Sequence, residues 1–324
     1  MSSSLSRRLF LIDGALILAA AAWPRGRVLA ADNVLRQSSA RPVVRFGVIT
    51  DVHYADKPPA GTRFYRDSLP KMQVAVAALN DIAKSDATGL AFGAMLGDLV
   101  DSAGATVSDE SVARELGYLK TIDAEWARLG ADRHYVLGNH CVDTLTKAEF
   151  AAETKARLAP YSVDVPFRGA EGALHVVALD ACFNGAGAPY GRKNFDWRDS
   201  NIPDAHVDWL AADLAATRHP VIVLAHQRLD GSGDHHVRNA ARVRGVLEGA
   251  APKVLAVLQG HSHRNVLAVV NGIPYCVARA MVEAEGPTNN AFATVELFAD
   301  HSLAVRGRYQ QTTYDKITSF SDGR

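Results

Sequence analysis

The chain has 324 residues, of which 48% are hydrophobic and 22% are charged. These are ordinary values for a globular protein, and they exclude a disordered chain or a collagen-like repeat. The formal charge is zero, but the first 30 residues hold four arginines and one aspartate, so the remainder carries a charge near −3. This slightly acidic remainder predicts no binding to nucleic acid.

Residues 1–30 resemble a bacterial twin-arginine signal peptide. Arg7-Arg8 precedes the apolar run Leu9–Trp23, and Val28–Ala30 offers small residues as a candidate cleavage site. The run is 15 residues long and contains Asp13, whereas a membrane-spanning helix needs about 20 apolar residues. We therefore expect export by the twin-arginine machinery, to the periplasm or beyond, and no permanent membrane anchor.

Residues 31–42 are polar and predict a linker before a folded domain over residues 43–315 and a polar tail over 316–324. Apolar runs bounded by turn residues predict strands at Val43–Ile49, Leu90–Leu96, His134–Leu137, Leu174–Leu179, Val221–Ala225, Val254–Leu258, Ile273–Val277, Ala291–Leu297 and Leu303–Val305. Helical periodicity predicts helices at Leu69–Ile82, Val112–Leu129, Lys147–Leu158, Val207–Leu214 and Val237–Leu247.

Strands and helices alternate as far as residue 258, after which strands dominate. This order predicts an α/β domain with parallel strand pairing that ends in antiparallel strands. The polar and glycine-containing stretch Asn184–Asn201 predicts a long surface loop.

Polar residues follow the ends of five predicted strands. Asp51 and His53 follow the first, and residues two apart in an extended chain project to the same side. Each segment alone is explained equally well by a turn, a helix cap or a solvated pair. Because ligands bind outside the carboxyl ends of strands in such sheets, we expect all five to converge. The other four segments are Gly97–Asp101, Gly138–His140, His226 and Gly260–His263.

The converging donor groups are four imidazoles, two carboxylates and one amide, with no thiolate. This set suits Mn, Fe or Zn and disfavours Ca or Cu(I). In this arrangement Asp98 would bridge two cations, with one oxygen to each. The candidate ligands are Asp51, His53, Asp98, Asn139, His226, His261 and His263.

Two other groups of reactive residues have structural explanations. His235-His236 precedes Val237, which favours the start of a helix near the site over another ligand pair. The three cysteines, Cys141, Cys182 and Cys276, form no CxxC motif. Buried free thiols are favoured, and a Cys182–Cys276 disulfide is the alternative.

The ordered motifs DxH, GDxxD, GNH, H and GHxH over residues 51–263 resemble those of the calcineurin-like metallophosphoesterase family. The resemblance implies a four-layer α/β sandwich, in which two mixed β-sheets are flanked by helices. It also implies that Asp51, His53 and His263 hold one metal, that Asp98 bridges, and that the second metal is held by Asn139, His226 and His261. Asp101 stands where purple acid phosphatases have a metal-binding tyrosine, so that branch is disfavoured.

Two cations about 3.5–4 Å apart lower the pKa of a shared water and orient an in-line attack on phosphorus, so the expected nucleophile is a metal-bound hydroxide. His140 follows a ligand and is expected to stabilise the developing charge or to protonate the leaving oxygen. By the resemblance, Asp101 would orient His140. Cys141 stands where the family commonly has an acidic residue, so the polarity beside His140 departs from the family pattern, and a thiol would be open to oxidation there if it were exposed.

Residues 46–66 and 281–292 resemble the manganese-dependent ADP-ribose/CDP-alcohol diphosphatase branch, which often carries Gln where this chain has His53. Arg63 and Arg66 are candidates to bind a second phosphate, with a salt-bridged start of a helix as the alternative. Tyr54 is a candidate to stack on a base, with Tyr65 as the alternative, and Asn239 is a candidate contact to the substrate.

We therefore expect an exported hydrolase with two divalent metal ions that cleaves a small phosphorylated substrate. The expected bond is a phosphodiester or a phosphoanhydride of the nucleotide-diphosphate type. The alternatives are a phosphomonoesterase with the same metal site and a catalytically silent metal-binding protein.

Overall fold

The computed structural model describes residues 41–318. The signal peptide expected over residues 1–30, and all of the expected linker except Arg41 and Pro42, lie outside the described residues. Within residues 41–318, no helix is both long enough and apolar enough to cross a membrane.

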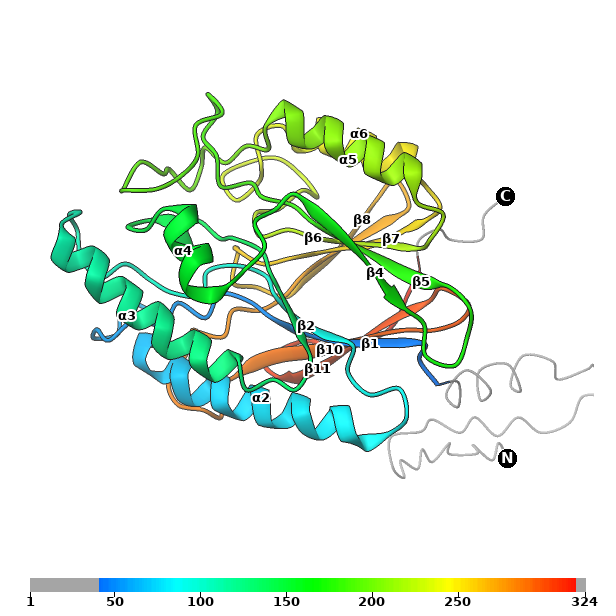
Figure 1. Ribbon diagram of the computed structural model, residues 1–324, viewed down its shortest axis with the longest axis horizontal. Helices are drawn as coiled ribbons and strands as arrows, with labels where there is room; N and C mark the ends of the chain where they lie inside the picture. The colour runs from blue at the N-terminus through cyan, green and yellow to red at the C-terminus, as the bar shows by residue number, and fades with distance from the viewer. Residues whose placement is uncertain (1–40, 319–324) are drawn as a thin grey trace, which may run out of the picture. The chain divides into compact units, whose positions relative to one another are not determined.

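Two six-stranded mixed sheets form the centre of the domain (Figure 1). In the first sheet, β1, β2 and β3 are parallel, and β10, β11 and β12 extend the β1 edge in antiparallel fashion. The order of the strands is β12-β11-β10-β1-β2-β3. Their bounds are β1 Val44–Ile49, β2 Phe92–Met95, β3 Asp132–Tyr135, β10 Ala291–Leu297, β11 Leu303–Tyr309 and β12 Tyr314–Ile317.

The second sheet has the order β4-β5-β6-β7-β9-β8. Its four central strands are parallel, and both edge strands are antiparallel to their neighbours. The bounds are β4 Tyr161–Pro166, β5 Ala173–Ala178, β6 Val221–Leu224, β7 Val254–Gln259, β8 Val266–Val270 and β9 Ile273–Val277.

The facing sides of the two sheets bury one shared apolar core. Phe46 and Phe92 of the first sheet stack with their ring centroids 4.5 Å apart, and they belong to the same cluster as Leu174 and Ile222 of the second. Central strands buried on both faces read as continuous apolar runs, which is why they could be recognised in the sequence.

Helices cover the two outer faces and complete the four expected layers (Figure 1). Side chains of α2, α3 and α4 pack on the first sheet in one cluster, and side chains of α5 and α6 pack on the second sheet in another. The helices are α2 Ser68–Ser85, α3 Asp109–Trp126, α4 Lys147–Thr154, α5 Asp204–Ala216 and α6 Ala240–Gly249, with short 3-10 turns η1 Tyr65–Asp67 and η2 His140–Val142. The two-sheet sandwich implied by the resemblance is therefore confirmed.

Three strands escaped the prediction, and all three lie at sheet edges. β4 alternates apolar and polar residues and ends at Pro166, and proline is common on edge strands because it donates no hydrogen bond to a neighbour. β8 pairs with β9 through the two-residue turn Asn271-Gly272, both at positive φ, which is a recognisable hairpin signal. β12 runs to the buried Ile317, past the expected domain boundary at residue 315, so the polar tail begins later than predicted.

The helix expected to start at Val237 begins instead at Ala240. His235 and His236 therefore lie in the loop that precedes α6, not in its first turn. The stretch 184–201 contains no helix or strand, as expected for a loop.

The ionisation of Glu115 on α3 gives a test of this packing by pH. Its side chain is fully buried, with Oε2 accepting a hydrogen bond from the Ala103 amide at 3.1 Å. Burial, reinforced by the charge of Asp143, raises the pKa of Glu115 to about 7. Because the folded state holds this proton more tightly than the unfolded chain does, its stability falls as pH rises from about 4.5 to 7.

We therefore expect Glu115→Gln to stabilise the protein above pH 7 by up to roughly 3 kcal/mol, since one pKa unit corresponds to about 1.4 kcal/mol. The gain should shrink towards zero near pH 4.5. Urea unfolding of both proteins at pH 5, 6, 7 and 8 measures it. A gain that does not change with pH would show that ionised Glu115 is not what costs stability.

Candidate metal centre

The candidate ligands all follow the carboxyl ends of strands, and both sheets contribute. Asp51 and His53 follow β1, Asp98 follows β2 and Asn139 follows β3, all in the first sheet. In the second sheet, His226 follows β6, and His261 and His263 follow β7. The five segments therefore converge across the line where the two sheets meet.

The loops that carry these residues have an unusual backbone. The φ angles of Asp51, His53, Asp98, His261 and His263 are all positive, between +47° and +71°. Each such residue costs roughly 1–2 kcal/mol relative to the ordinary conformation. Hydrogen bonds hold the strained loops, including Asp51 N to Gly97 O at 3.0 Å and His53 N to Asp98 O at 2.8 Å. Strain of this kind gathers at functional sites.

One group of donors consists of Asp51, His53 and His263. The Nε2 atom of His263 is 3.3 Å from Asp51 Oδ1, and the Nε2 atom of His53 is 3.8 Å from the same oxygen. The two Nε2 atoms are 3.1 Å apart. All three ligand atoms therefore face one small volume.

A second group consists of Asp98, His226 and His261, with Asn139 beside them. His226 Nε2 lies 3.1 Å from Asp98 Oδ2. Asn139 Oδ1 and His261 Nε2 are buried and have no hydrogen-bond partner among residues 41–318, and neither does His226 Nε2, because its contact with Asp98 is close but lacks hydrogen-bond geometry. Buried polar atoms are rarely left without a partner, so these three mark a place that a cation would fill.

Asp98 lies between the two groups. Its Oδ2 is 3.1 Å from His226 Nε2 and 3.4 Å from His53 Nε2. Its Oδ1 accepts a hydrogen bond from the His140 amide at 2.8 Å. We expected one oxygen to face each cation, whereas here a single oxygen faces both groups and the other is held by the backbone.

Three of the four candidate histidines have their second ring nitrogen held in place. The Nδ1 atom of His53 is 2.8 Å from Asp101 Oδ2, and that of His263 is 2.6 Å from Glu283 Oε1. The Nδ1 atom of His226 is 2.7 Å from the Leu96 carbonyl oxygen. Partners of this kind fix the tautomer that leaves Nε2 free to bind a metal.

The site concentrates negative charge in a buried place. Burial alone would raise the pKa of Asp51 and Asp98, but the charges of the neighbouring imidazoles hold both values well below the usual range. Burial disfavours protonation of His226 and His263, yet the charges of Asp98 and Asp51 raise their pKa values to about 9. Nearby positive charge therefore stabilises the two buried carboxylates, and metal cations would provide it.

Asp101 contacts more groups than predicted. The same Oδ2 that faces His53 is 3.2 Å from His140 Nδ1, and Oδ1 accepts a hydrogen bond from Lys57 Nζ at 2.6 Å. Burial opposes protonation of His140, but the charges of Asp101 and Asp98 outweigh it and raise the pKa of that imidazole. Asp101 therefore orients a candidate metal ligand as well as His140.

A pocket of about 180 Å³ opens over the candidate ligands. Arg63 lines it, with Nη1 3.7 Å from Asp101 Oδ2. Two further lining residues were not predicted from the sequence: Trp197 from the loop 184–201, and His235. Their ring centroids are 5.0 Å apart, and that of His235 is 5.4 Å from that of His261.

The other predicted substrate contacts do not line this pocket. Arg66 is exposed and pairs with Asp56 at 2.6 Å, so the salt-bridged alternative describes it. Tyr54 packs edge-on against Tyr118. The Asn239 amide, at the start of α6, donates to the Ile202 carbonyl at 2.7 Å and accepts from its N–H at 3.2 Å, so the backbone of residue 202 occupies it.

The three cysteines are buried free thiols, as the sequence favoured. Cys141 is fully buried in the cluster between the first sheet and its helices, and its Sγ accepts a hydrogen bond from the Leu99 amide at 3.3 Å. Burial raises the pKa of this thiol to about 12, which makes it unreactive. Cys182 and Cys276 are also buried and free, so the predicted alternative of a disulfide between them is not formed.

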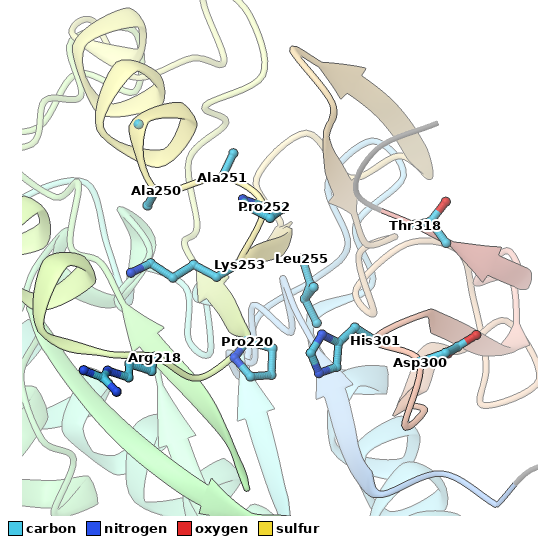
Figure 2. A pocket seen from close by; sticks show the side chains of 11 residues that line it. Arg218, Pro220, Ala250, Ala251, Pro252, Lys253, Leu255, Asp300, His301 and Thr318 are labelled. Carbon is cyan, nitrogen blue, oxygen red and sulfur yellow. The ribbon is translucent and has the colours of Figure 1, made fainter. Parts of the chain in front are cut away.

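A larger hollow of about 550 Å³ lies at the opposite ends of the strands (Figure 2). Pro220 and Lys253 directly precede β6 and β7, and Asp300 and His301 form the turn between β10 and β11. The Lys253 ammonium donates to the carbonyl of Thr217 at 3.0 Å, where α5 ends. This hollow is thus separate from the candidate metal centre.

Comparisons with known proteins agree with this geometry. The sequence model of the calcineurin-like phosphoesterase family matches residues 44–265, so the chain belongs to that family. It is 26% identical over 319 residues to the manganese-dependent ADP-ribose/CDP-alcohol diphosphatase of Oryza sativa subsp. japonica, covering 85% of this chain and 94% of the relative. The protein of the same name from Arabidopsis thaliana is 33% identical over 118 residues, covering 35% of this chain and 34% of the relative.

Solved structures show the same fold. A dimetal phosphatase from Danio rerio matches with a TM-score of 0.71 and 19% identity, over 86% of this chain and all of that one. The GAP50 anchor in the inner membrane complex of Plasmodium matches with a TM-score of 0.52 and 12% identity, over 86% and 90% of the two chains. Because the fold also serves an anchor protein, the fold alone does not establish catalysis. Family membership and the diphosphatase relatives identify this chain as a metal-dependent phosphoester hydrolase.

The close approach of Gly138 to Asp98 gives a test of the geometry. A methyl group on Gly138 would overlap Oδ1 and the backbone nitrogen of Asp98, so Asp98 would have to move. We expect Gly138→Ala to weaken Mn²⁺ binding at least ~100-fold, as calorimetry can measure, since a displaced ligand loses its geometry.

Gly117, exposed on α3, supplies the matched control because a methyl group there meets no atom within 4 Å. Gly117→Ala should bind Mn²⁺ as the parent does and gain about 0.5–1 kcal/mol of stability from helix propensity. Normal Mn²⁺ binding by Gly138→Ala would contradict the placement of Asp98.

Proposed function

We propose that this chain is an exported hydrolase that uses two divalent cations, manganese first among them, to cleave the diphosphate bond of a nucleotide-diphosphate type of substrate. The main support for the metal site is that three buried atoms have no hydrogen-bond partner among the described residues: Asn139 Oδ1, His226 Nε2 and His261 Nε2. Nitrogen and oxygen donors without thiolate suit manganese, iron or zinc.

Two sets of donors fit two cations. Asp51, His53 and His263 would hold one cation, while Asn139, His226 and His261 would hold the other. Asp98 Oδ2, which faces both groups, would be shared. When bound, the cations supply the Lewis acidity and charge neutralisation that attack on phosphorus requires.

Side chains of the pocket would act on the proton and on the substrate. His140 keeps Nδ1 towards Asp101, so Nε2 is the atom that can give a proton to the leaving oxygen. The charge of Asp101 beside Nδ1 favours the protonated form of the ring. Arg63, whose side chain is 33% exposed at the pocket, would bind the second phosphate through its guanidinium.

The substrate class rests on the diphosphatase relatives together with the placement of Arg63. A phosphomonoester has only one phosphate, whereas a diphosphate has a second phosphate that the Arg63 guanidinium, beside the metal centre, would bind. A position that often holds Gln in that branch is His53 here, and its imidazole has Asp101 as a fixed partner. The chain therefore keeps a full set of donors.

Turnover of ADP-ribose, CDP-choline, bis-p-nitrophenyl phosphate and p-nitrophenyl phosphate with Mn²⁺ tests this function. We expect the highest kcat/KM on ADP-ribose or CDP-choline. We also expect a loss of about 1,000-fold or more in Asp98→Asn, because losing the shared carboxylate charge weakens the hold on both cations and costs several kcal/mol in the transition state. Asp213→Asn, on α5, is the control and should keep full activity.

A higher kcat/KM on p-nitrophenyl phosphate than on the other three substrates would reject the diphosphatase activity and favour a phosphomonoesterase. No turnover of any of the four by protein that binds two Mn²⁺ would reject the hydrolase for these substrates.

The export part of the proposal rests on Arg7-Arg8 and the apolar run that follows. Cell fractionation of the protein and of its Arg7→Lys, Arg8→Lys double variant tests it. We expect the double variant to stay in the cytoplasm. Undiminished export of that variant would reject the twin-arginine route.

A further inference from the structure

A fully buried lysine, Lys71, lies in the first turn of α2. Its ammonium donates three hydrogen bonds to backbone carbonyls: to Met281 at 3.0 Å, to Glu283 at 2.9 Å and to Ala284 at 2.7 Å. All three hydrogens of the ammonium are therefore used on a single four-residue segment, Met281–Ala284.

A buried ammonium is expensive to keep. Burial lowers the pKa of Lys71 to about 8, against 10.5 for an ordinary lysine. A methionine or leucine at this position would avoid that cost, although it would leave three buried carbonyls without donors. The Lys71 ammonium thus stabilises the backbone conformation of Met281–Ala284.

The segment Met281–Ala284 lies directly beside the strand end that carries Asp51. The amide of Met281 donates to Thr50 O at 3.1 Å, and the amide of Val282 donates to Asp51 O at 3.1 Å. Ala284 has a φ of +60°, a conformation that residues other than glycine adopt only when their surroundings impose it. Its amide donates to Thr62 O at 2.9 Å, and Lys71 holds its carbonyl.

Among the described residues, Glu283 is the only member of this segment whose side chain forms a hydrogen bond with a candidate metal ligand. Its Oε1 is 2.6 Å from His263 Nδ1, and this hydrogen bond lowers the pKa of Glu283 to about 2. The His263 ring can present Nε2 to Asp51 only while Glu283 stays in place. The contacts therefore run from Lys71 through the backbone of Glu283 to His263.

We propose that Lys71 is a positioning residue for the cation held by Asp51, His53 and His263: its ammonium fixes the backbone of Met281–Ala284 so that Glu283 aims His263 Nε2 at the metal. This rests on the two-cation site proposed above. No hydrogen bond among the described residues joins this segment to Asn139, His226 or His261, so the effect is expected at one of the two sites.

Titration with Mn²⁺, followed by the electron paramagnetic resonance signal of the free aqueous ion, tests the proposal. We expect wild type to bind two Mn²⁺ and Lys71→Met to bind one of them about 10- to 100-fold more weakly, the usual effect of losing a group that orients a ligand. The affinity of the second Mn²⁺ should change by no more than about 2-fold.

Arg45 provides a control for loss of stability alone. Arg45 is also a buried cation, but it lies on β1. It donates hydrogen bonds to Asp86 and Glu296 near the start of that strand, at the end opposite to the metal centre. Arg45→Met should lower the unfolding temperature as Lys71→Met does, yet bind both Mn²⁺ normally. Equal weakening of both sites in Lys71→Met and Arg45→Met would show that Lys71 is only structural.

A double-mutant cycle with Glu283→Gln tests the route of the effect. If Lys71 acts through Glu283, the double variant should bind Mn²⁺ no more weakly than the weaker single variant, whereas additive losses would reject the route. Should Lys71→Met fail to fold, Lys71→Gln keeps two N–H donors and is expected to show a smaller loss at the same site.

The outcomes separate this inference from the proposed function. Wild-type protein that binds no Mn²⁺ would overturn the metal centre and the role of Lys71 together. Wild-type protein that binds two Mn²⁺, with Lys71→Met unchanged, would overturn the role of Lys71 alone.

Discussion

Two buried carboxylates impose the condition that the rest of the site satisfies. Asp51 and Asp98 are almost completely removed from water, where an isolated negative charge is strongly disfavoured. Imidazoles surround them within 3.1–3.8 Å, and amides of His140 and His261 donate to them. The buried negative charges of these two carboxylates explain why cations bind here, and why the strained loops around both residues are kept despite their cost.

The site depends on the contact between the two sheets. Three strands of the first sheet and two of the second supply the candidate ligands, so neither sheet alone holds a complete set. The shared core that contains Phe46, Phe92 and Ile222 fixes the sheets relative to each other. Core packing and metal binding are therefore coupled, because a shift of one sheet would separate Asp98 from His226.

A second layer of contacts extends the site beyond its ligands. Asp101, Glu283 and the Leu96 carbonyl each hold one Nδ1 atom, which leaves the matching Nε2 atom facing the centre. Asp101 also links the ligand His53 to His140 and Arg63 at the pocket. One carboxylate thus orients a metal ligand and the candidate proton donor together, and this arrangement joins cation binding to the positioning of the substrate.

The sequence by itself determined the central strands and the set of converging donors, because runs buried on both faces and motifs after strand ends are local signals. The four layers followed from the resemblance to the family. It missed β4, β8 and β12, since edge strands are half exposed and carry weaker patterns. Only the tertiary structure decided that Arg63 rather than Arg66 lines the pocket, that Trp197 and His235 line it too, and that Glu283 contacts His263. Those outcomes depend on contacts between segments far apart in the chain, and no local pattern in the sequence specifies them.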